Sequence, residues 1–256
     1  MTELKPGQSG ETVLTHLEDG VLTVRLNRAK SAHARNQIMR DELASLWRVV
    51  AADRDVRVVL TGAGARYFCA GMDLREASEP EEPVARRDRM QRSRDIELLA
   101  DLPQPSVAAI NGYALGGGLE MALACDMRLI ADSAQVGLPE VTRGLVPGGG
   151  GTQRLPRLIG YARACELVLS GRRLTAHEAV DWGIAARVVP AAELLAAARE
   201  LAASIAAHPE PAVRYAKVLL RRSLQVPVSG GVDAELDVVL TLLAQARVSG
   251  GNRLST

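Results

Sequence analysis

The sequence predicts an α/β protein whose C-terminal part is helical, and three observations support this expectation. Short β-rich or apolar stretches alternate with helical patterns up to about Val189. Only helical patterns follow from there onward. With 47% hydrophobic and 24% charged residues, the 256-residue chain can bury a sizeable core. We therefore expect a core domain over residues 1–190 and a helical C-terminal region over residues 191–256.

The first part of the chain contains a hairpin, a helix and a strand. Two β-rich stretches flank Asp19-Gly20, a dipeptide typical of hairpin turns. Apolar residues recur at roughly the helical period over residues 37–53, which predicts a helix. The apolar run over 56–62 predicts a buried strand, and a loop is expected over 63–74. The charged stretch over 76–94 is expected to be partly mobile, and its EPEEP segment has too little apolar content to pack.

The second part of the chain continues the alternation and then becomes helical. An apolar strand over 105–112 ends in Asn-Gly, and the segment over 111–126 is expected to start a helix. Two short strands come next, and the segments after them are all predicted to be helical: strands over 127–132 and 134–138, then helices over 162–171, 175–183, 191–208, 211–224 and 233–247.

Composition and charge argue against several classes of protein. The net charge is +1, aromatic residues make up 3% and the arginines are dispersed, so we expect no nucleic-acid partner. No apolar run approaches the ~18 residues of a membrane span, and the first residues lack a signal-peptide pattern. Cys69, Cys125 and Cys165 lack CxxC spacing, which indicates reduced thiols and a cytoplasmic protein. The histidines lack metal-ligand spacing, so we expect no metal.

A run of glycines stands directly before a glutamate in the segment NGYALGGGLEMALACD. Glycine inside a helix costs up to ~1 kcal/mol relative to alanine, so Gly116, Gly117 and Gly118 need a physical reason. Tight packing of a strand against a helix is one reason. Ligand access is the other, because the first N–H groups of a helix lack intrahelical partners and can form an oxyanion hole. The segment lacks the lysine and Ser/Thr of a phosphate-binding P-loop.

Two other stretches have a similar character. In YFCAGMDL, the glycine at position 71 would let a ligand reach the N–H of Met72, although an ordinary glycine turn explains the same residues. In GLPEVTRGLVPGGGG, Glu140 follows a proline among glycines and apolar residues. Such surroundings raise the pKa of a carboxyl group and suit acid–base chemistry, whereas the alternative is a solvated loop glutamate.

Together and in this order, the three stretches resemble the crotonase superfamily, the enoyl-CoA hydratase/isomerase group. The resemblance covers residues 12–224 and is more specific for the superfamily than for the reaction. It implies a spiral of ββα units whose C-terminal helices mediate trimers that often pair into hexamers. It also implies an acyl-CoA substrate, in which coenzyme A is part of the substrate and no separate cofactor is needed.

The resemblance also assigns roles to individual residues. It implies that the N–H groups of Met72 and Gly117 bind the thioester oxygen, and that Glu120 and Glu140 hold a water. In a hydratase, Glu120 would help to activate this water and Glu140 would protonate Cα. Six further positions are expected to contact substrate or coenzyme A: Ala34, Ala70, Gly71, Asp73, Leu74 and Gly116. A 3-enoyl-CoA isomerase or another crotonase-type enzyme remains an alternative, as does a non-catalytic acyl-CoA- or RNA-binding protein.

Three departures from the family pattern bear on these roles. The NRPxxxNAL pattern is replaced by NRAKSAHARNQIM, with an insertion that contains His33 and with Gln37 at a position where a small residue is usual. We expect His33 to be an exposed loop residue, although a catalytic role is the alternative. The usual C-terminal tail is absent, so the coenzyme A pocket is either completed differently or served by a naturally short tail. Met72 is bulky and is expected to narrow the acyl pocket.

Overall fold

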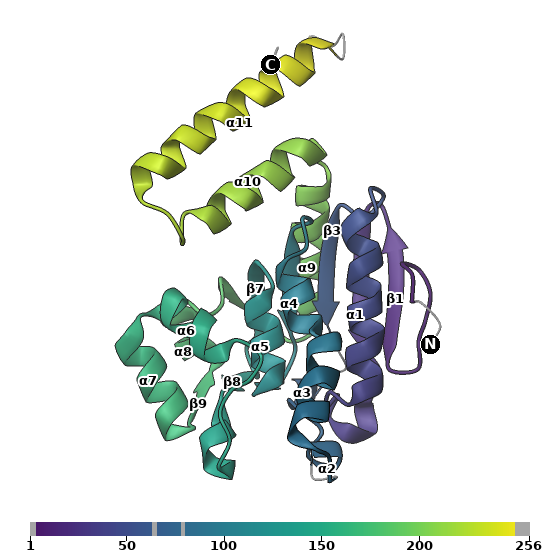
Figure 1. The fold of residues 1–256 in the computed structure, drawn as a ribbon, viewed down its shortest axis with the longest axis vertical. Helices are drawn as coiled ribbons and strands as arrows, with labels where there is room; N and C mark the ends of the chain where they lie inside the picture. The colour runs from purple at the N-terminus through teal and green to yellow at the C-terminus, as the bar shows by residue number, and fades with distance from the viewer. Residues whose placement is uncertain (1–3, 63–65, 78–79, 249–256) are drawn as a thin grey trace.

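The computed structural model describes residues 4–62, 66–77 and 80–248, and it contains two β-sheets. The six-stranded sheet has the order β1-β2-β3-β5-β7-β10. Its strands β1 and β2 form an antiparallel hairpin, and the other pairs are parallel. Its strands are Val13–Glu18, Val21–Leu26, Val58–Gly62, Ser106–Ile110, Met127–Ala131 and Arg187–Val189. Figure 1 shows the order of the elements along the chain.

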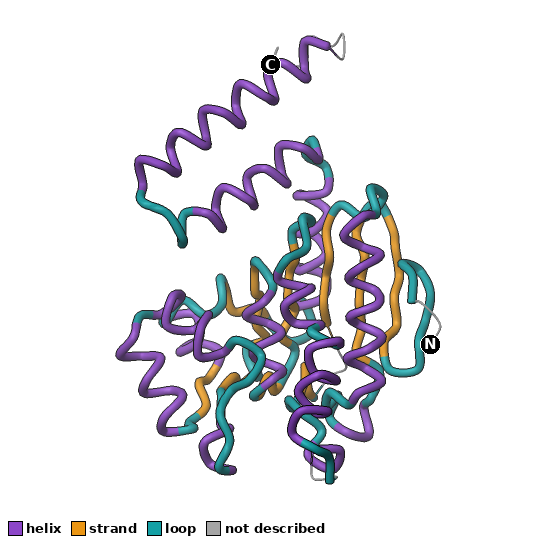
Figure 2. The backbone as a smooth tube through the Cα atoms, in the orientation of Figure 1, coloured by secondary structure: helices purple, strands orange, loops and turns teal. Residues whose placement is uncertain are grey.

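The second sheet explains how the chain repeats. It has four strands in the order β4-β6-β8-β9: Tyr67–Cys69, Tyr113–Leu115, Gln135–Gly137 and Arg173–Thr175. The successive pairs β3–β4, β5–β6 and β7–β8 each place their first strand in the six-stranded sheet and their second strand in the four-stranded sheet. The chain therefore passes repeatedly from one sheet to the other, which agrees with the predicted α/β spiral of ββα units. Figure 2 shows the strands in orange and the helices in purple.

Two helices lie over the six-stranded sheet or inside the core. Helix α1 (Gln37–Ala52) begins where the side chain of Asn36 accepts a hydrogen bond from the Met39 N–H, a regular N-cap. It buries an apolar face that includes Leu43, Leu46 and Trp47. Helix α5 (Gly117–Ala124) is buried along its whole length, as its apolar sequence requires.

The last helices follow the final strand, as the alternation in the sequence predicts. Helix α9 (Leu194–Ala206) packs against β2, β3, β5 and β7 through a buried stripe that includes Leu194 and Ala198. Helices α10 (Glu210–Arg222) and α11 (Val228–Val248) pack on each other and project from the body (Figure 1). The buried Nζ of Lys217 anchors α10 by donating to the carbonyl oxygen of Gln104.

The remaining helices connect the sheets or cover their edges: α2 (Leu74–Ala77), α3 (Pro83–Arg92), α4 (Asp95–Ala100), α6 (Gly151–Ile159), α7 (Tyr161–Ser170) and α8 (Ala176–Asp181). Short 3-10 turns cover Ala29–Ser31 and Pro139–Arg143, named η1 and η2. Among the described residues, no helix is both long enough and apolar enough to cross a lipid bilayer. The expectation about the C-terminal tail concerns residues 249–256, which lie outside the described residues.

Candidate active site

Two backbone N–H groups, those of Met72 and Gly117, form the centre of the candidate site. Gly117 is the first residue of α5, so its N–H has no acceptor within the helix. Met72 pairs in parallel with Arg35, whose N–H donates to Gly71 O at 2.7 Å and whose carbonyl accepts from Asp73 N at 3.1 Å. Because Gly71 O and Asp73 N both bond to the Arg35 backbone, the N–H of Met72 between them points away from Arg35. Among the described residues, neither N–H has a hydrogen-bond acceptor.

Glycines bring these two donors close together. A β-carbon added to Gly117 would lie 3.7 Å from the Met72 nitrogen. A β-carbon added to Gly71 would lie 2.8 Å from the Leu115 carbonyl oxygen and 3.3 Å from the Gly117 nitrogen, and Gly71 has φ +97°. Glycine is the residue that tolerates both the left-handed backbone and this close approach. The two N–H groups can therefore donate to one oxygen atom.

Gly118 serves packing rather than ligand access. A β-carbon on Gly118 would lie 2.1 Å from the carbonyl oxygen of Cys69, so α5 rests directly on the backbone of β4. The packing reason for the glycine run therefore applies at Gly118, and the geometry at Gly117 is compatible with the reason of ligand access. Gly118 permits the close contact between strand and helix, and Gly117 provides an N–H that no described acceptor occupies.

Glu120 lies within the first turn of α5 and is oriented by a distant glycine-rich loop. Its side chain is buried, and its Oε1 accepts hydrogen bonds from Gly149 N at 2.7 Å and Gly151 N at 2.8 Å. Gly151 is the first residue of α6, so this contact uses a second helix N-terminus. A β-carbon on Gly149 would lie 2.7 Å from Glu120 Oε2. The loop therefore leaves room only for glycine beside this carboxylate.

Glu140 approaches the same helix start from the 3-10 turn η2. A β-carbon on Gly116, which has φ +52°, would lie 2.8 Å from Glu140 Oε1. Burial raises the pKa of Glu140, and the charge of Glu120 raises it further, while a backbone hydrogen bond and Arg143 offset only part of the effect. This direction agrees with the sequence-based expectation. Glu140 Oε2 is buried and has no hydrogen-bond partner among the described residues.

The other predicted contact residues lie around the Met72 donor. Ala34 and Ala70 belong to the segments that pair beside it, and Arg28 Nη1 donates to the Ala34 carbonyl oxygen. The Asp73 carboxylate is held by Arg28 Nη2 at 3.0 Å. Leu74 is exposed at the start of α2. Asp73 therefore directs its side chain to Arg28, while Leu74 faces solvent.

In the inserted segment, the burial of His33 differs from the sequence-based expectation. His33 was expected to be an exposed loop residue, and this is wrong, because His33 is 4% exposed. Its Nδ1 accepts a hydrogen bond from the Arg28 N–H at 3.1 Å. Burial lowers the pKa of His33, and the charge of Arg25 lowers it further. The histidine thus stabilises the fold of the insertion.

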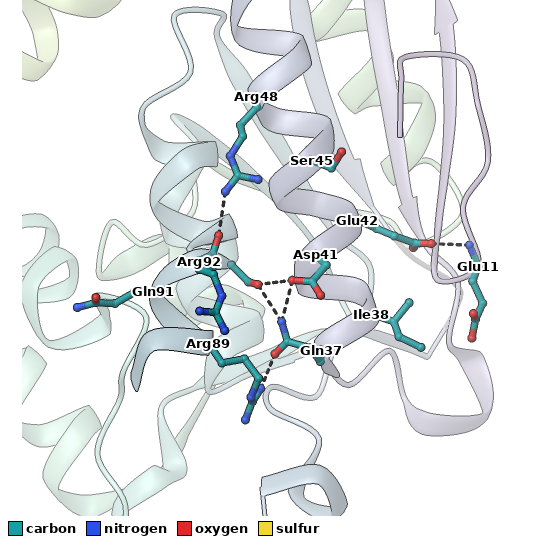
Figure 3. A pocket seen from close by; sticks show the side chains of 11 residues that line it. Glu11, Gln37, Ile38, Asp41, Glu42, Ser45, Arg48, Arg89, Gln91 and Arg92 are labelled. Carbon is teal, nitrogen blue, oxygen red and sulfur yellow. Dashed lines mark hydrogen bonds between the residues drawn. The ribbon is translucent and has the colours of Figure 1, made fainter. Parts of the chain in front are cut away.

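Two cavities lie on the α1–α3 side of the molecule. The first, of about 1080 Å³, opens between α1 and α3 and is lined by none of the predicted contact residues (Figure 3). Gln37 lies at its edge, where its Nε2 donates to Asp41 at 2.7 Å and to Ser93 at 2.8 Å. The second cavity, of about 30 Å³, borders Met72. Met72 is 38% exposed, and the expectation that its side chain narrows the acyl pocket stays a prediction.

Residues that the sequence did not single out complete the site. Arg35 and Asp95 form a buried ion pair in which Arg35 Nη2 lies 2.5 Å from Asp95 Oδ1. Arg35 Nη1 would lie 2.9 Å from a β-carbon on Gly117. The sequence also assigned no role to the N–H groups of Gly149 and Gly151, which hold Glu120.

The arrangement suits chemistry on a polarised carbonyl group. Backbone donors at Met72 and Gly117 can stabilise negative charge on one oxygen atom. Glu120 lies in the first turn of α5 and Glu140 reaches the same helix start from η2, and the interaction between their charges contributes to the raised pKa of Glu140. A buried carboxyl group with a raised pKa can donate a proton near neutral pH.

Comparison with known proteins agrees with this geometry. The family model for enoyl-CoA hydratase/isomerase matches residues 16–253. The chain is 43% identical over 212 residues to the carnitinyl-CoA dehydratase of Proteus mirabilis, covering 82% of this chain and 80% of that protein. An enoyl-CoA hydratase from Bacillus anthracis superposes with a TM-score of 0.87 at 39% identity and 94% coverage of both chains.

A third relative adds information about ligands. A Thermobifida fusca protein solved in complex with CoA superposes with a TM-score of 0.85 at 32% identity, covering 92% of this chain and 94% of that one. The family match spans most of the chain, and the paired sheets and the glycine-bounded helix start agree with it. The chain therefore belongs to the enoyl-CoA hydratase/isomerase family, within the crotonase superfamily.

Proposed function

We propose that this protein is an enoyl-CoA hydratase that adds water reversibly, in the syn sense, to a trans-2-enoyl-CoA. The observation that carries the proposal is the convergence of Glu120 and Glu140 on a helix start with two free N–H donors. A double-bond isomerase needs only one carboxylate to move a proton, whereas hydration needs a base for water and an acid for Cα. The presence of both glutamates favours hydration.

The first step of the proposed mechanism is polarisation of the thioester. The carbonyl oxygen accepts hydrogen bonds from the N–H groups of Met72 and Gly117, which lowers the electron density at Cβ. Each donor of this kind is typically worth ~2.7–4 kcal/mol of transition-state stabilisation. Because the donors belong to the backbone, side-chain substitution cannot remove them directly.

The second step uses the two carboxyl groups. Glu120, whose Oε1 is fixed by Gly149 and Gly151, directs its other oxygen to the water and accepts a proton from it as the water oxygen bonds to Cβ. Glu140 supplies its own proton to Cα, a role that suits its raised pKa and its unpartnered buried Oε2. The proton taken up by Glu120 then passes to Glu140, which restores the acid and the base for the next turnover. Both groups act from one side of the substrate, which accounts for syn addition.

Coenzyme A is part of the proposed substrate, and we propose no further cofactor. The CoA complex of the Thermobifida fusca relative supports this substrate class. Ala34, Ala70 and Gly71 are the proposed contacts for the pantetheine and thioester end.

We also propose a homotrimer or a pair of trimers built through the C-terminal helices. Helix α11 exposes a series of large apolar side chains that a monomer would leave in water: Val232, Leu236, Val239, Leu240 and Leu243. The domain boundary near residue 190 and the cytoplasmic location stay predictions.

The direct test is incubation with crotonyl-CoA while the absorbance of the conjugated enoyl thioester is followed. Loss of this absorbance in the wild type, and a fall by orders of magnitude in Glu120→Gln and Glu140→Gln, would support hydration. Production of the same absorbance from a 3-enoyl-CoA would instead indicate isomerisation. Calorimetric binding of CoA without turnover of any enoyl-CoA would indicate a non-catalytic binding protein.

A further inference from the structure

The segment that contains Arg35 forms one side of the candidate oxyanion hole. The Arg35 backbone bonds to Gly71 O and Asp73 N, on either side of Met72. The Ala70 N–H extends this contact by donating to the Ala32 carbonyl oxygen at 3.1 Å. Any shift of Arg35 would therefore move the Met72 donor with it.

The Arg35 side chain reaches the second donor. Its Nη1 would lie 2.9 Å from a β-carbon on Gly117, so the guanidinium lies beside the start of α5. Its Nη2 is bound to Asp95 Oδ1, and Asp95 is the first residue of α4. Arg35 is 8% exposed and Asp95 is 2% exposed. One residue thus connects the Met72 loop, the Gly117 helix start and α4.

This ion pair is poorly suited to a purely stabilising role. Among the described residues, Arg35 Nε and Asp95 Oδ2 are buried without a hydrogen-bond partner. Burying charges with unsatisfied atoms is unfavourable, and a cation beside a helix N-terminus is repelled by the helix dipole. The repulsion between the guanidinium and the helix dipole is offset when negative charge develops at that helix start, as it does on a thioester oxygen in the transition state.

The guanidinium stays charged in this position. Burial alone would lower the pKa of Arg35, but the charge and hydrogen bond of Asp95 outweigh burial and raise it. The charge of Glu120 acts in the same direction as Asp95. The positive charge is therefore present at every pH at which the enzyme would work.

We propose that Arg35 and Asp95 are positioning residues for the oxyanion hole. Asp95 holds the guanidinium, which fixes the Met72 and Gly117 N–H groups relative to each other and adds positive charge behind them. This inference rests on the proposed hydratase function, because it assigns the pair to the same thioester oxygen.

The test uses a chromophoric substrate analogue, 4-dimethylaminocinnamoyl-CoA, whose absorption maximum moves to longer wavelength when its carbonyl group is polarised. The variants are Arg35→Met, Arg35→Lys and Asp95→Asn. Lys217→Met is the matched control, because Lys217 is also a buried cation paired with a carboxylate, at 2.7 Å from Asp126 Oδ2. Spectral shift, kcat, KM and thermal stability are measured for each protein.

We expect the wild type and Lys217→Met to show the full red shift, even if the control melts earlier. Arg35→Met should lose most of the shift and about 100-fold in kcat with little change in KM, as a misplaced transition-state contact does. Arg35→Lys should keep more of the shift than Arg35→Met, and Asp95→Asn should lose part of it. If Arg35→Met does not fold, the other two variants still decide the question.

Two results would count against the proposal in different ways. A wild-type red shift that all three variants retain, with unchanged kcat, would overturn the role of the pair and leave the hydratase proposal standing. A wild type that binds the analogue without a red shift would contradict the oxyanion hole itself, and both proposals would fall together.

Discussion

Replacement of Gly118 by alanine perturbs the oxyanion hole without changing a proposed catalytic group. The new β-carbon would lie 2.1 Å from the Cys69 carbonyl oxygen, whereas ordinary contacts begin at 3.4 Å. Strand β4 and helix α5 must therefore separate by roughly 1 Å, and these elements carry the segments that present the Met72 and Gly117 donors. A misplacement of about 1 Å can cost about 100-fold in rate, which is ~2.7 kcal/mol of transition-state stabilisation.

Stability should respond much less than activity to this change. Alanine is favoured over glycine in a helix by up to ~1 kcal/mol. Overpacking against a backbone carbonyl costs about 1–3 kcal/mol. These effects oppose each other, so we expect a net loss of no more than about 2 kcal/mol and a decrease in Tm of several degrees at most. The variant should fold and work slowly.

The assay is steady-state hydration of crotonyl-CoA, with circular dichroism and thermal melting to verify the fold. Gly148→Ala is the matched control, because a β-carbon at Gly148 would meet nothing within 4 Å. We expect the control to keep wild-type kcat and Gly118→Ala to lose about 100-fold. A folded Gly118→Ala protein with wild-type kcat would refute the placement of the two donors.

Three further predictions concern the carboxylates and the C-terminal helices. Glu140→Gln should abolish hydration yet raise the Tm at neutral pH. Burial raises the pKa of Glu140 in the folded state above its unfolded value of 4.5. The ionised wild-type carboxylate therefore destabilises the fold, and this destabilisation grows as pH rises from 4.5 through the folded-state pKa. An unchanged or lower Tm would contradict this reasoning. The wild-type hydration rate should fall as pH rises through the raised pKa of Glu140, because the proton donor is lost; a pH–rate profile that stays level at high pH would argue against Glu140 as the acid. Leu240→Asp, at a side chain that is 56% exposed on α11, should convert trimers to monomers in light scattering, and an unchanged mass would place the interface elsewhere.

Regular periodicity made the longer elements predictable from the sequence. The helix expected over 37–53 is observed as Gln37–Ala52, and the last strand ends at Val189, where the alternation was expected to stop. The three-residue strands β4 and β6 were missed, because a strand this short shows no periodic pattern and β6 precedes the glycine run directly. These strands form because they pair with their neighbours in the four-stranded sheet.

The charged segment shows why composition alone is a poor guide. The stretch over 76–94 was expected to be partly mobile and no helix was predicted there, yet it contains the ten-residue helix α3, none of whose residues is buried. Pro83 starts the helix at a favourable position, and Glu81 forms ion pairs with Arg86 and Arg89. Local charge pairing thus supplies the order that apolar burial does not.

The site could be predicted only in part. Met72, Gly117, Glu120 and Glu140 came from motifs whose spacing resembles the family. The Arg35–Asp95 pair joins residues 60 positions apart, and the sequence pattern assigns neither side chain a role, so only the folded chain shows the contact. The glycines near Glu140 in sequence were recognised, but their N–H groups bind Glu120, because the loop folds back onto α5.

Mass spectrometry of products from a panel of enoyl-CoA thioesters tests the central claim most directly. We predict that at least one trans-2-enoyl-CoA gains one molecule of water in the presence of the wild-type protein. Neither Glu120→Gln nor Glu140→Gln should produce this gain at a comparable rate. An unchanged mass with a displaced double bond, formed from a 3-enoyl-CoA while every 2-enoyl-CoA stays unhydrated, would contradict the account.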